Sequence, residues 1–218
     1  DSDPDDGYGK RKPLVTCHIR KMINSLPLRE PPTEAGPLAR SKYLRALRNR
    51  AMILLGFAGA FRGSELARME IEEVDPNPRG VEIFVPDPKI DPRTVGISYA
   101  EDPIICPIRS LEKWRDTAEI DSGPIFRRVW NSTKISPDAV TYMCIYRTIK
   151  KIAERAGIDP DKVGAHSLRR GHITQAAMKG ASLRRLQKQA GHKDPRTTIE
   201  YIKNANRMED ETSQELGL

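Results

Sequence analysis

The sequence lacks the features that would mark a membrane-spanning or disulfide-rich protein. Its longest apolar run, residues 51–61, is too short to span a bilayer and predicts a buried helix instead. The chain opens without the pattern of a secretory leader. It contains only three cysteines, Cys17, Cys106 and Cys144, and none of them has CxxC spacing. They argue against a disulfide framework and against a zinc site, and they are typical of a reducing cytosol.

Positive charge is distributed unevenly along the chain. The net charge of the 218 residues is +7, yet residues 126–203 alone contain 17 Lys and Arg against 6 Asp and Glu. Residues 76–125 and 204–218 are both net acidic. A concentrated basic stretch is expected where a protein meets a polyanion such as a nucleic-acid backbone. A solvated basic face is the alternative, so charge indicates only a class of partner.

The hydrophobic pattern predicts an α+β fold that is mainly α-helical with one small antiparallel β-sheet. Helices are expected at residues 17–25, 41–59, 64–70, from 107 through 114, 136–157, 167–179, 182–191 and from 194 onward, with caps at Ser41, Ser64, Ser182 and Asp194 and a start at Ser136-Pro137. Strands are expected at residues 81–85, 94–98 and 103–105, with a Pro-rich loop at 87–92.

Four polar clusters are not explained by this pattern alone. They centre, in chain order, on Arg62, on His166 with Arg169, on His192, and on Tyr201. Three-residue spacing on a helix places His166 and Arg169 near one face, where they could converge on one anion. Taken singly, each cluster also has an ordinary explanation, such as a solvated helix end, a cap, a loop histidine or a packed tyrosine.

Taken together, the ordered set Arg, His-x-x-Arg, His, Tyr resembles the tyrosine recombinases, the phage integrase family. The resemblance extends from Arg62 to Tyr201, in which His192 follows Arg169 by 23 positions and Tyr201 follows His192 by 9. Residues 191–201, Gly-His-Lys-Asp-Pro-Arg-Thr-Thr-Ile-Glu-Tyr, are similar to the family's Leu-Gly-His…Thr…Tyr block. The resemblance implies the catalytic-domain fold of these enzymes for residues 14–203.

The resemblance also implies a site-specific DNA recombinase or integrase that breaks and rejoins duplex DNA through a 3′-phosphotyrosine. Tyr201 would be the nucleophile. Arg62 and Arg169 would clamp the phosphate, because a guanidinium is planar, permanently charged and bidentate toward it. His166 and His192 would donate hydrogen bonds to its non-bridging oxygens. The scheme implies no cofactor, neither metal nor ATP, and the sequence offers no clustered carboxylate set for Mg²⁺.

In this family a lysine on a β-hairpin protonates the leaving 5′-oxygen, and Lys89, 27 residues after Arg62, occupies the matching place. Arg93 is the fallback, because the surroundings of Lys89 are Pro-rich and lack the Thr that often follows it in relatives. Glu65 matches an acidic residue that is expected to orient its neighbours. Candidate DNA contacts are Arg93, Arg170, Lys193 and Arg196.

Family members usually carry an N-terminal helical domain that closes around DNA, and too few residues precede Arg62 to form one. We therefore expect a fragment of a longer protein or a minimal member. Residues 1–13 are expected to be a disordered linker remnant. Residues 204–218 are expected to be a tail that either frays or is exchanged between subunits.

The expected partner is duplex DNA, bound by a protein that is monomeric or weakly associating when free and tetrameric on paired sites. No membrane is expected, and the location would be the cytoplasm, nucleoid or nucleus. Three alternatives stay open. A type IB topoisomerase or telomere resolvase would use the same chemistry, a catalytically inactive regulator would keep the fold, and a basic helical domain would bind RNA or protein.

Overall fold

The structure is a computed structural model that describes residues 11–86, 92–192, 194–196, 198–199 and 202. It is mainly α-helical, as expected, with two small antiparallel sheets instead of one. The α-helices are α1 (Thr16–Asn24), α2 (Gly36–Ala58), α3 (Gly63–Arg68), α4 (Pro107–Ala118), α5 (Tyr142–Arg155), α6 (His166–Met178) and α7 (Leu183–Ala190). Single 3₁₀ turns are η1 (Thr33–Ala35), η2 (Ile71–Glu73) and η3 (Pro160–Lys162).

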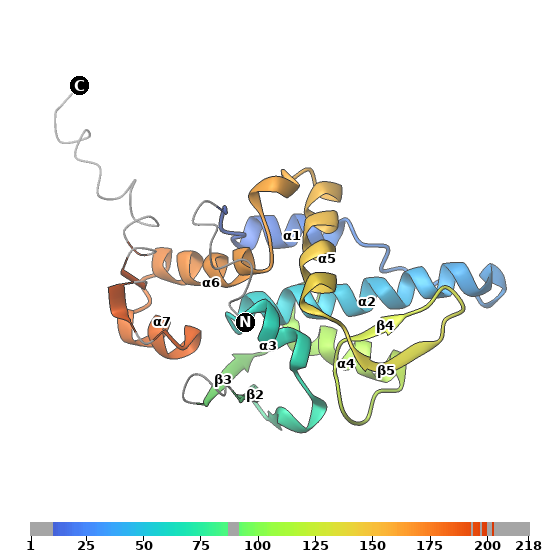
Figure 1. Cartoon of the computed structure of the whole chain (residues 1–218), viewed down its shortest axis with the longest axis horizontal. Helices are drawn as coiled ribbons and strands as arrows, with labels where there is room; N and C mark the ends of the chain where they lie inside the picture. Colours follow the sequence, from blue (N-terminus) through green and yellow to red (C-terminus); the bar gives the residue numbers. More distant parts are fainter. Residues whose placement is uncertain (1–10, 87–91, 193, 197, 200–201, 203–218) are drawn as a thin grey trace.

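Helix α2 runs through the middle of the molecule along its longest axis (Figure 1). Helices α6 and α7 lie toward one end, and the hairpin of β4 (Arg127–Val129) and β5 (Ile135–Ala139) lies toward the other (Figure 1). Its second half is apolar and almost fully buried, so it forms the centre of the main hydrophobic core. Its first half carries several basic side chains. Within the described ranges, no helix is both long and apolar enough to cross a membrane.

The larger sheet has the order β1-β2-β3, formed by β1 (Val74–Asn77), β2 (Gly80–Val85) and β3 (Arg93–Ser98). The predicted strands at 81–85 and 94–98 are confirmed, and their register pairs Val85 with Arg93. The predicted strand at 103–105 is wrong, because these residues form a turn. Strand β1 was not predicted because it contains Pro76, which a sheet tolerates at an edge strand such as this one.

Two predicted helix starts are wrong. Helix α2 begins at Gly36 with a proline in its first turn, and Ser41 lies inside it, where its hydroxyl donates to the Leu38 carbonyl at 3.0 Å. Ser136-Pro137 belongs to β5 (Ile135–Ala139), which pairs with β4 (Arg127–Val129). Helix α5 starts only after Thr141, whose side chain accepts a hydrogen bond from the Cys144 amide. A side-chain cap, and not the Ser-Pro pair, therefore sets the start of this helix.

The chain before α1 runs along α6. The Leu14 amide donates to the Ser167 carbonyl at 3.0 Å, and the Thr16 amide donates to Gln175 Oε1 at 3.1 Å. Arg11 donates to the Val163 carbonyl at 2.8 Å. Residues 11–13 were expected to belong to a linker remnant, but they are docked on the domain. Residues 1–10 lie outside the described residues.

Helix α7 rests on a second and much smaller apolar cluster. Its fully buried members are Ala60, Ile173, Ala177, Leu186 and Ala190, contributed by the turn after α2, by α6 and by α7. Polar contacts supplement this cluster, since the Gln189 side-chain amide donates to the carbonyls of Ala58 and Gly96, both at 3.3 Å. The end of α7 is thereby held near the ends of α2 and β3.

Candidate active site

The turn that follows α2 sets the position of the first site residue. Ala60 adopts a left-handed conformation with φ of 52°, and the Phe61 amide donates back to the Gly56 carbonyl at 3.2 Å. The helix ends at its C-cap Gly59, as predicted, and the left-handed residue is the alanine that follows, which costs roughly 1–2 kcal/mol. Arg169 compensates by donating from Nη1 to the buried Ala60 carbonyl at 2.9 Å.

Arg62 is the N-cap of α3, so the predicted cap at Ser64 is wrong. Its amide donates to Glu65 Oε2 and its Nη1 to Glu65 Oε1, each at 2.8 Å. A side chain on Gly63 would come within 2.9 Å of the Tyr142 ring and of Ala165. Glycine at this position therefore lets the start of α3 pack against the starts of α5 and α6.

Glu65 is the acidic centre of the site, and its side chain is only 3% exposed. Besides Arg62, it binds Arg93 through both oxygens, with Arg93 Nη1 on Oε1 and Nη2 on Oε2, each at 2.8 Å. Burial by itself would raise the pKa of Glu65. The hydrogen bonds and charge of Arg93, the charge of Arg169 and the Arg62 amide outweigh burial and lower this pKa to about 2.

Helix α6 contributes His166 as its first residue and Arg169 one turn later. His166 is half-buried, whereas Arg169 is 1% exposed and among the largest fully buried side chains. The positive charge of Arg169 lowers the pKa of both Glu65 and His192. Glu65 of α3 and His192 after α7 therefore both lie within electrostatic reach of this one guanidinium of α6.

His192 follows α7, which ends at Gly191 in a left-handed conformation with φ of 64°. Its Nδ1 lies 2.8 Å from the Thr198 hydroxyl oxygen, and Thr198 is fully buried. Burial is the main cause that lowers the pKa of His192 to about 3, and further lowering comes from the positive charges of Arg169, Arg62, His166 and Arg93. The imidazole is therefore neutral in the free protein at neutral pH.

Arg93 contacts the turn that carries His192. A Cβ added to Gly191 would lie 2.8 Å from Arg93 Cδ and 3.0 Å from its Nε. Glycine is required here for two reasons, the left-handed backbone and the close approach of the Arg93 side chain.

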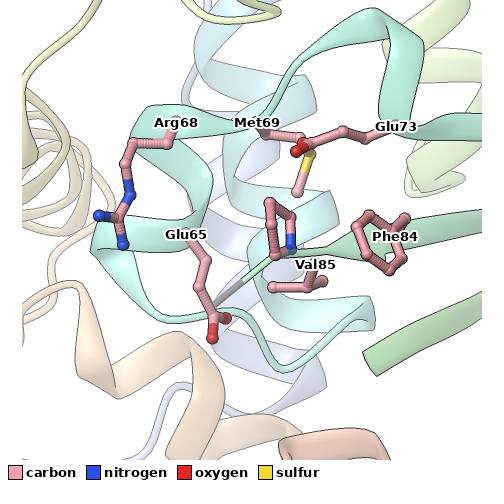
Figure 2. A pocket seen from close by; sticks show the side chains of 7 residues that line it. Glu65, Arg68, Met69, Glu73, Phe84 and Val85 are labelled. Carbon is pink, nitrogen blue, oxygen red and sulfur yellow. The ribbon is translucent and has the colours of Figure 1, made fainter. Parts of the chain in front are cut away.

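A small cavity of about 180 Å³ opens beside Glu65, between α3, η2 and the end of β2 (Figure 2). It is lined by Glu65, Arg68, Met69, Glu73, Phe84, Val85 and Pro86. The cavity lies at the end of the strand that precedes Lys89 in the sequence.

Of the predicted site residues, the structure brings together Arg62, Glu65, Arg93, His166, Arg169 and His192. Lys89, Lys193 and Tyr201 lie outside the described residues, and their roles stay predictions. The Arg196 side chain is 88% exposed and pairs with Asp194 at 2.9 Å, whereas Arg170 is half-buried in α6. The assignment of Arg170 and Arg196 as DNA contacts stays a prediction.

Sequence reasoning gave no role to Thr198. The signal was available, because this threonine lies within the segment that resembles the family block, six residues after His192. The contact between Arg93 and Glu65 carried no such local signal, because the two residues lie 28 positions apart in the chain.

The site carries an excess of positive charge. Arg62, Arg93 and Arg169 surround one carboxylate, that of Glu65, and the imidazole of His192 is neutral. Such a group of guanidiniums matches the geometry and charge of a phosphate. No group of three His, Cys, Asp or Glu side chains that could hold a metal ion occurs in the part of the chain that the structure describes.

Comparison with known proteins gives concordant matches. Residues 38–208 match the phage integrase family. The integrase/recombinase xerD homolog of Selenomonas ruminantium is 37% identical over 171 residues, which make up 77% of this chain and 50% of that protein. The chain thus spans about half the length of this relative.

Solved structures share the fold. The XerH site-specific recombinase in a post-cleavage complex with palindromic difH substrate superposes with a TM-score of 0.72 at 19% identity, covering 98% of this chain and 56% of that one. A lambda integrase dimer bound to a COC′ core site gives a TM-score of 0.61 at 15% identity, covering 94% and 52%. From the family match, the 37% identical relative and the shared fold, we conclude that this chain belongs to the phage integrase family, the tyrosine recombinases, and has the fold of their catalytic domain.

Proposed function

We propose that this chain is the catalytic domain of a site-specific DNA recombinase that cuts and rejoins duplex DNA through a phosphotyrosine at Tyr201. The observation that carries the proposal is that Arg62 and Arg169 lie within electrostatic reach of His192, in a group of side chains with excess positive charge. Family membership supports it. So do the relatives, since the XerH and lambda integrase structures contain their DNA sites.

The two family arginines would act by charge and placement. Attack on a phosphodiester builds a five-coordinate phosphorane whose equatorial oxygens carry more negative charge than the substrate. Arg62 and Arg169 are held in place before DNA arrives, by Glu65 and by the Ala60 carbonyl respectively. Pre-organised donors of this kind are worth about 3 kcal/mol each in transition-state stabilisation.

His192 would donate from Nε2 to a non-bridging phosphate oxygen. A neutral imidazole has one donor and one acceptor nitrogen, so Nδ1 must then accept the hydrogen bond from the Thr198 hydroxyl. Thr198 would thereby select the tautomer of His192. Because a bound phosphate adds negative charge, the pKa of His192 should rise when DNA binds.

The remaining steps are assigned by the family resemblance. The Tyr201 oxygen attacks phosphorus and passes its proton toward His166, and the bond from phosphorus to the 5′-oxygen breaks. Lys89 protonates that leaving oxygen. The 5′-hydroxyl of a second strand then attacks the phosphotyrosine and restores a phosphodiester. Bond energy is conserved in the covalent intermediate, so the scheme requires no ATP. It requires no metal, because the two arginines stabilise the charge of the phosphorane.

The proposed partner is duplex DNA, with four subunits assembled on two paired sites. The basic stretch at residues 126–203 supplies the attraction to the DNA backbone. DNA affinity should therefore fall steeply as the salt concentration rises.

A covalent-trapping gel tests the proposal. The protein, with any N-terminal region of its full-length form, is incubated with end-labelled nicked duplexes taken from the flanks of its own gene, and the mixture is run under denaturing conditions. Label should migrate with the wild-type protein and not with Tyr201→Phe, which should bind DNA normally. Binding without an adduct in the wild type would favour an inactive DNA-binding regulator.

The general acid is tested separately. Lys89→Ala should cleave slowly on normal DNA and recover on a substrate whose leaving oxygen is replaced by sulfur, because a thiolate needs no proton. If the sulfur substrate gives no recovery, the acid is another residue. Cleavage by the wild type should be unchanged by EDTA.

A further inference from the structure

Arg93 connects two parts of the site that are far apart in the sequence. Its two terminal nitrogens bind both oxygens of Glu65 at 2.8 Å, and the same carboxylate holds the amide and guanidinium of Arg62. Its Cδ and Nε pack against Gly191, the residue before His192. Arg93 is therefore in contact with α3 and with the turn after α7 at the same time.

This arrangement leaves Arg93 poorly suited to bind DNA directly. Its side chain is only 10% exposed, and both of its terminal nitrogens are occupied by a buried carboxylate. To contact a phosphate, Arg93 would have to release Glu65. That carboxylate is buried, and Arg93 contributes most to lowering its pKa.

We propose that Arg93 is a positioning residue for phosphoryl transfer, which acts by fixing the Arg62–Glu65 pair and the Gly191–His192 turn relative to one another. The proposal rests on the proposed function. It replaces direct DNA binding with an indirect role, in which Arg93 touches neither the phosphate nor the tyrosine.

The geometry explains why an arginine is needed at this position. A guanidinium is a rigid planar fork that engages both carboxylate oxygens at once, whereas an ammonium is a point charge that fixes no plane. Helix α7 has only a small apolar cluster beneath it, so packing alone restrains the His192 turn weakly. The Arg93 side chain adds a contact from β3, a strand anchored in the main core.

Cleavage kinetics distinguish positioning from DNA binding. Arg93→Met should lower the single-turnover cleavage rate at saturating DNA by roughly a hundredfold, because small misplacements of reacting groups have effects of this size. Its DNA dissociation constant and salt dependence should match those of Arg79→Met. That control removes the same charge from an exposed position at the other end of the sheet.

Arg93→Lys provides the second variant, because it keeps the charge and is the less disruptive substitution if Arg93→Met fails to fold. It should recover only part of the lost rate. Full recovery would show that charge alone matters and would overturn the proposal. Unchanged rate at saturating DNA, with weaker binding and a salt slope reduced by about one, would identify Arg93 as a phosphate contact.

A measurement without DNA separates this proposal from the proposed function. The His192 pKa is followed by NMR titration of the free protein, in which the charge of Arg93 is one cause of its lowering. It should rise in Arg93→Met and not in Arg79→Met. An unchanged His192 pKa would contradict the contact between Arg93 and this turn, whether or not the wild type forms a DNA adduct.

Discussion

The two sides of the site are supported very differently. Arg62 and Glu65 project from α3, and Arg169 from α6, both of which pack on the extensive core around α2. His192 follows α7, an eight-residue helix that covers a cluster of five fully buried side chains. The proposed phosphate clamp is thus supported by the main core, whereas the His192 imidazole is supported by the much smaller cluster.

Because of this difference, the side with the three charged residues and the side with His192 suit different tasks. A clamp must hold charged groups at fixed spacing while they are desolvated, and a large core resists their repulsion. A helix with little buried apolar area opens more readily, so α7 is the element of the site most easily displaced. Two hydrogen bonds from Gln189 to carbonyls and the close approach of the Arg93 side chain to Gly191 supplement its packing.

The largest effect on cleavage is expected from Arg169, on the side of the site that the main core supports. Arg169→Ala should reduce cleavage at saturating DNA by a hundredfold to a thousandfold, because a buried transition-state donor is lost. DNA affinity should fall only modestly. Single-turnover cleavage measured alongside DNA binding checks this, with Arg169→Lys as the conservative variant. Equal losses of rate and of affinity would reduce Arg169 to a simple phosphate contact.

Paired core substitutions test the contrast in packing. Leu55→Ala, in the main core, should lower the free energy of unfolding by about 2–5 kcal/mol and speed hydrogen exchange throughout α2. Leu186→Ala, in the small cluster, should speed exchange in α7 and leave α2 nearly unchanged. If both variants accelerate exchange equally in the two helices, the two regions open as one unit.

A smaller effect is expected at the contact between His192 and Thr198. Thr198→Val keeps the shape but removes the hydroxyl, so the imidazole loses the partner that fixes its tautomer. Cleavage should fall about tenfold, corresponding to roughly 1.4 kcal/mol, and Thr198→Ser should restore most of it. Nitrogen NMR of the His192 ring reports the tautomer directly, and an unchanged tautomer in Thr198→Val would rule out this role.

The smallest effect is the response to mild acid. The pKa of His192 is about 3 in the folded protein and 6.5 ordinarily, so only the unfolded chain gains a proton between these values, and stability falls as pH drops through this window. From pH 7 to 5.5 the loss is at most about 1.3 kcal/mol. Glu65, with a folded pKa of about 2 against 4.5, adds a further loss only below pH 4.5.

Urea denaturation at the two pH values measures this loss. His192→Asn should remove the His192 contribution and flatten the dependence, while His172, whose pKa burial also lowers, continues to contribute. A variant with the same pH dependence as the wild type would mean that His192 is solvated in the folded protein.

Local signals predicted much of this molecule. The His-x-x-Arg spacing on a helix and the glycine that ends α7 are short-range patterns, so the positions of His166, Arg169 and His192 followed from the sequence. The helix start at Thr141 was misplaced because Ser136-Pro137 also fits a helix start, and only the pairing of β5 with β4 excludes it.

Non-local contacts could not be predicted in this way. Arg93 meets Glu65 because β2 and β3 pair in one particular register, in which Arg93 lies opposite Val85. Its approach to Gly191 depends further on how α7 packs, 98 positions away in the chain. The hydrophobic pattern indicates that these elements exist but does not indicate which side chains meet between them.

The segment from Arg11 to Thr16 attaches the preceding chain to the domain, in part at α6. Backbone and side-chain hydrogen bonds fasten this segment to Val163, to Ser167 and to Gln175, before and along the helix that carries His166 and Arg169. A pull on the chain ahead of Arg11 is therefore delivered first to Val163 and to Tyr146 of α5, and then to α6 through Leu14 and Thr16. The helix that carries His166 and Arg169 is therefore one of the places where tension from the preceding chain enters the domain.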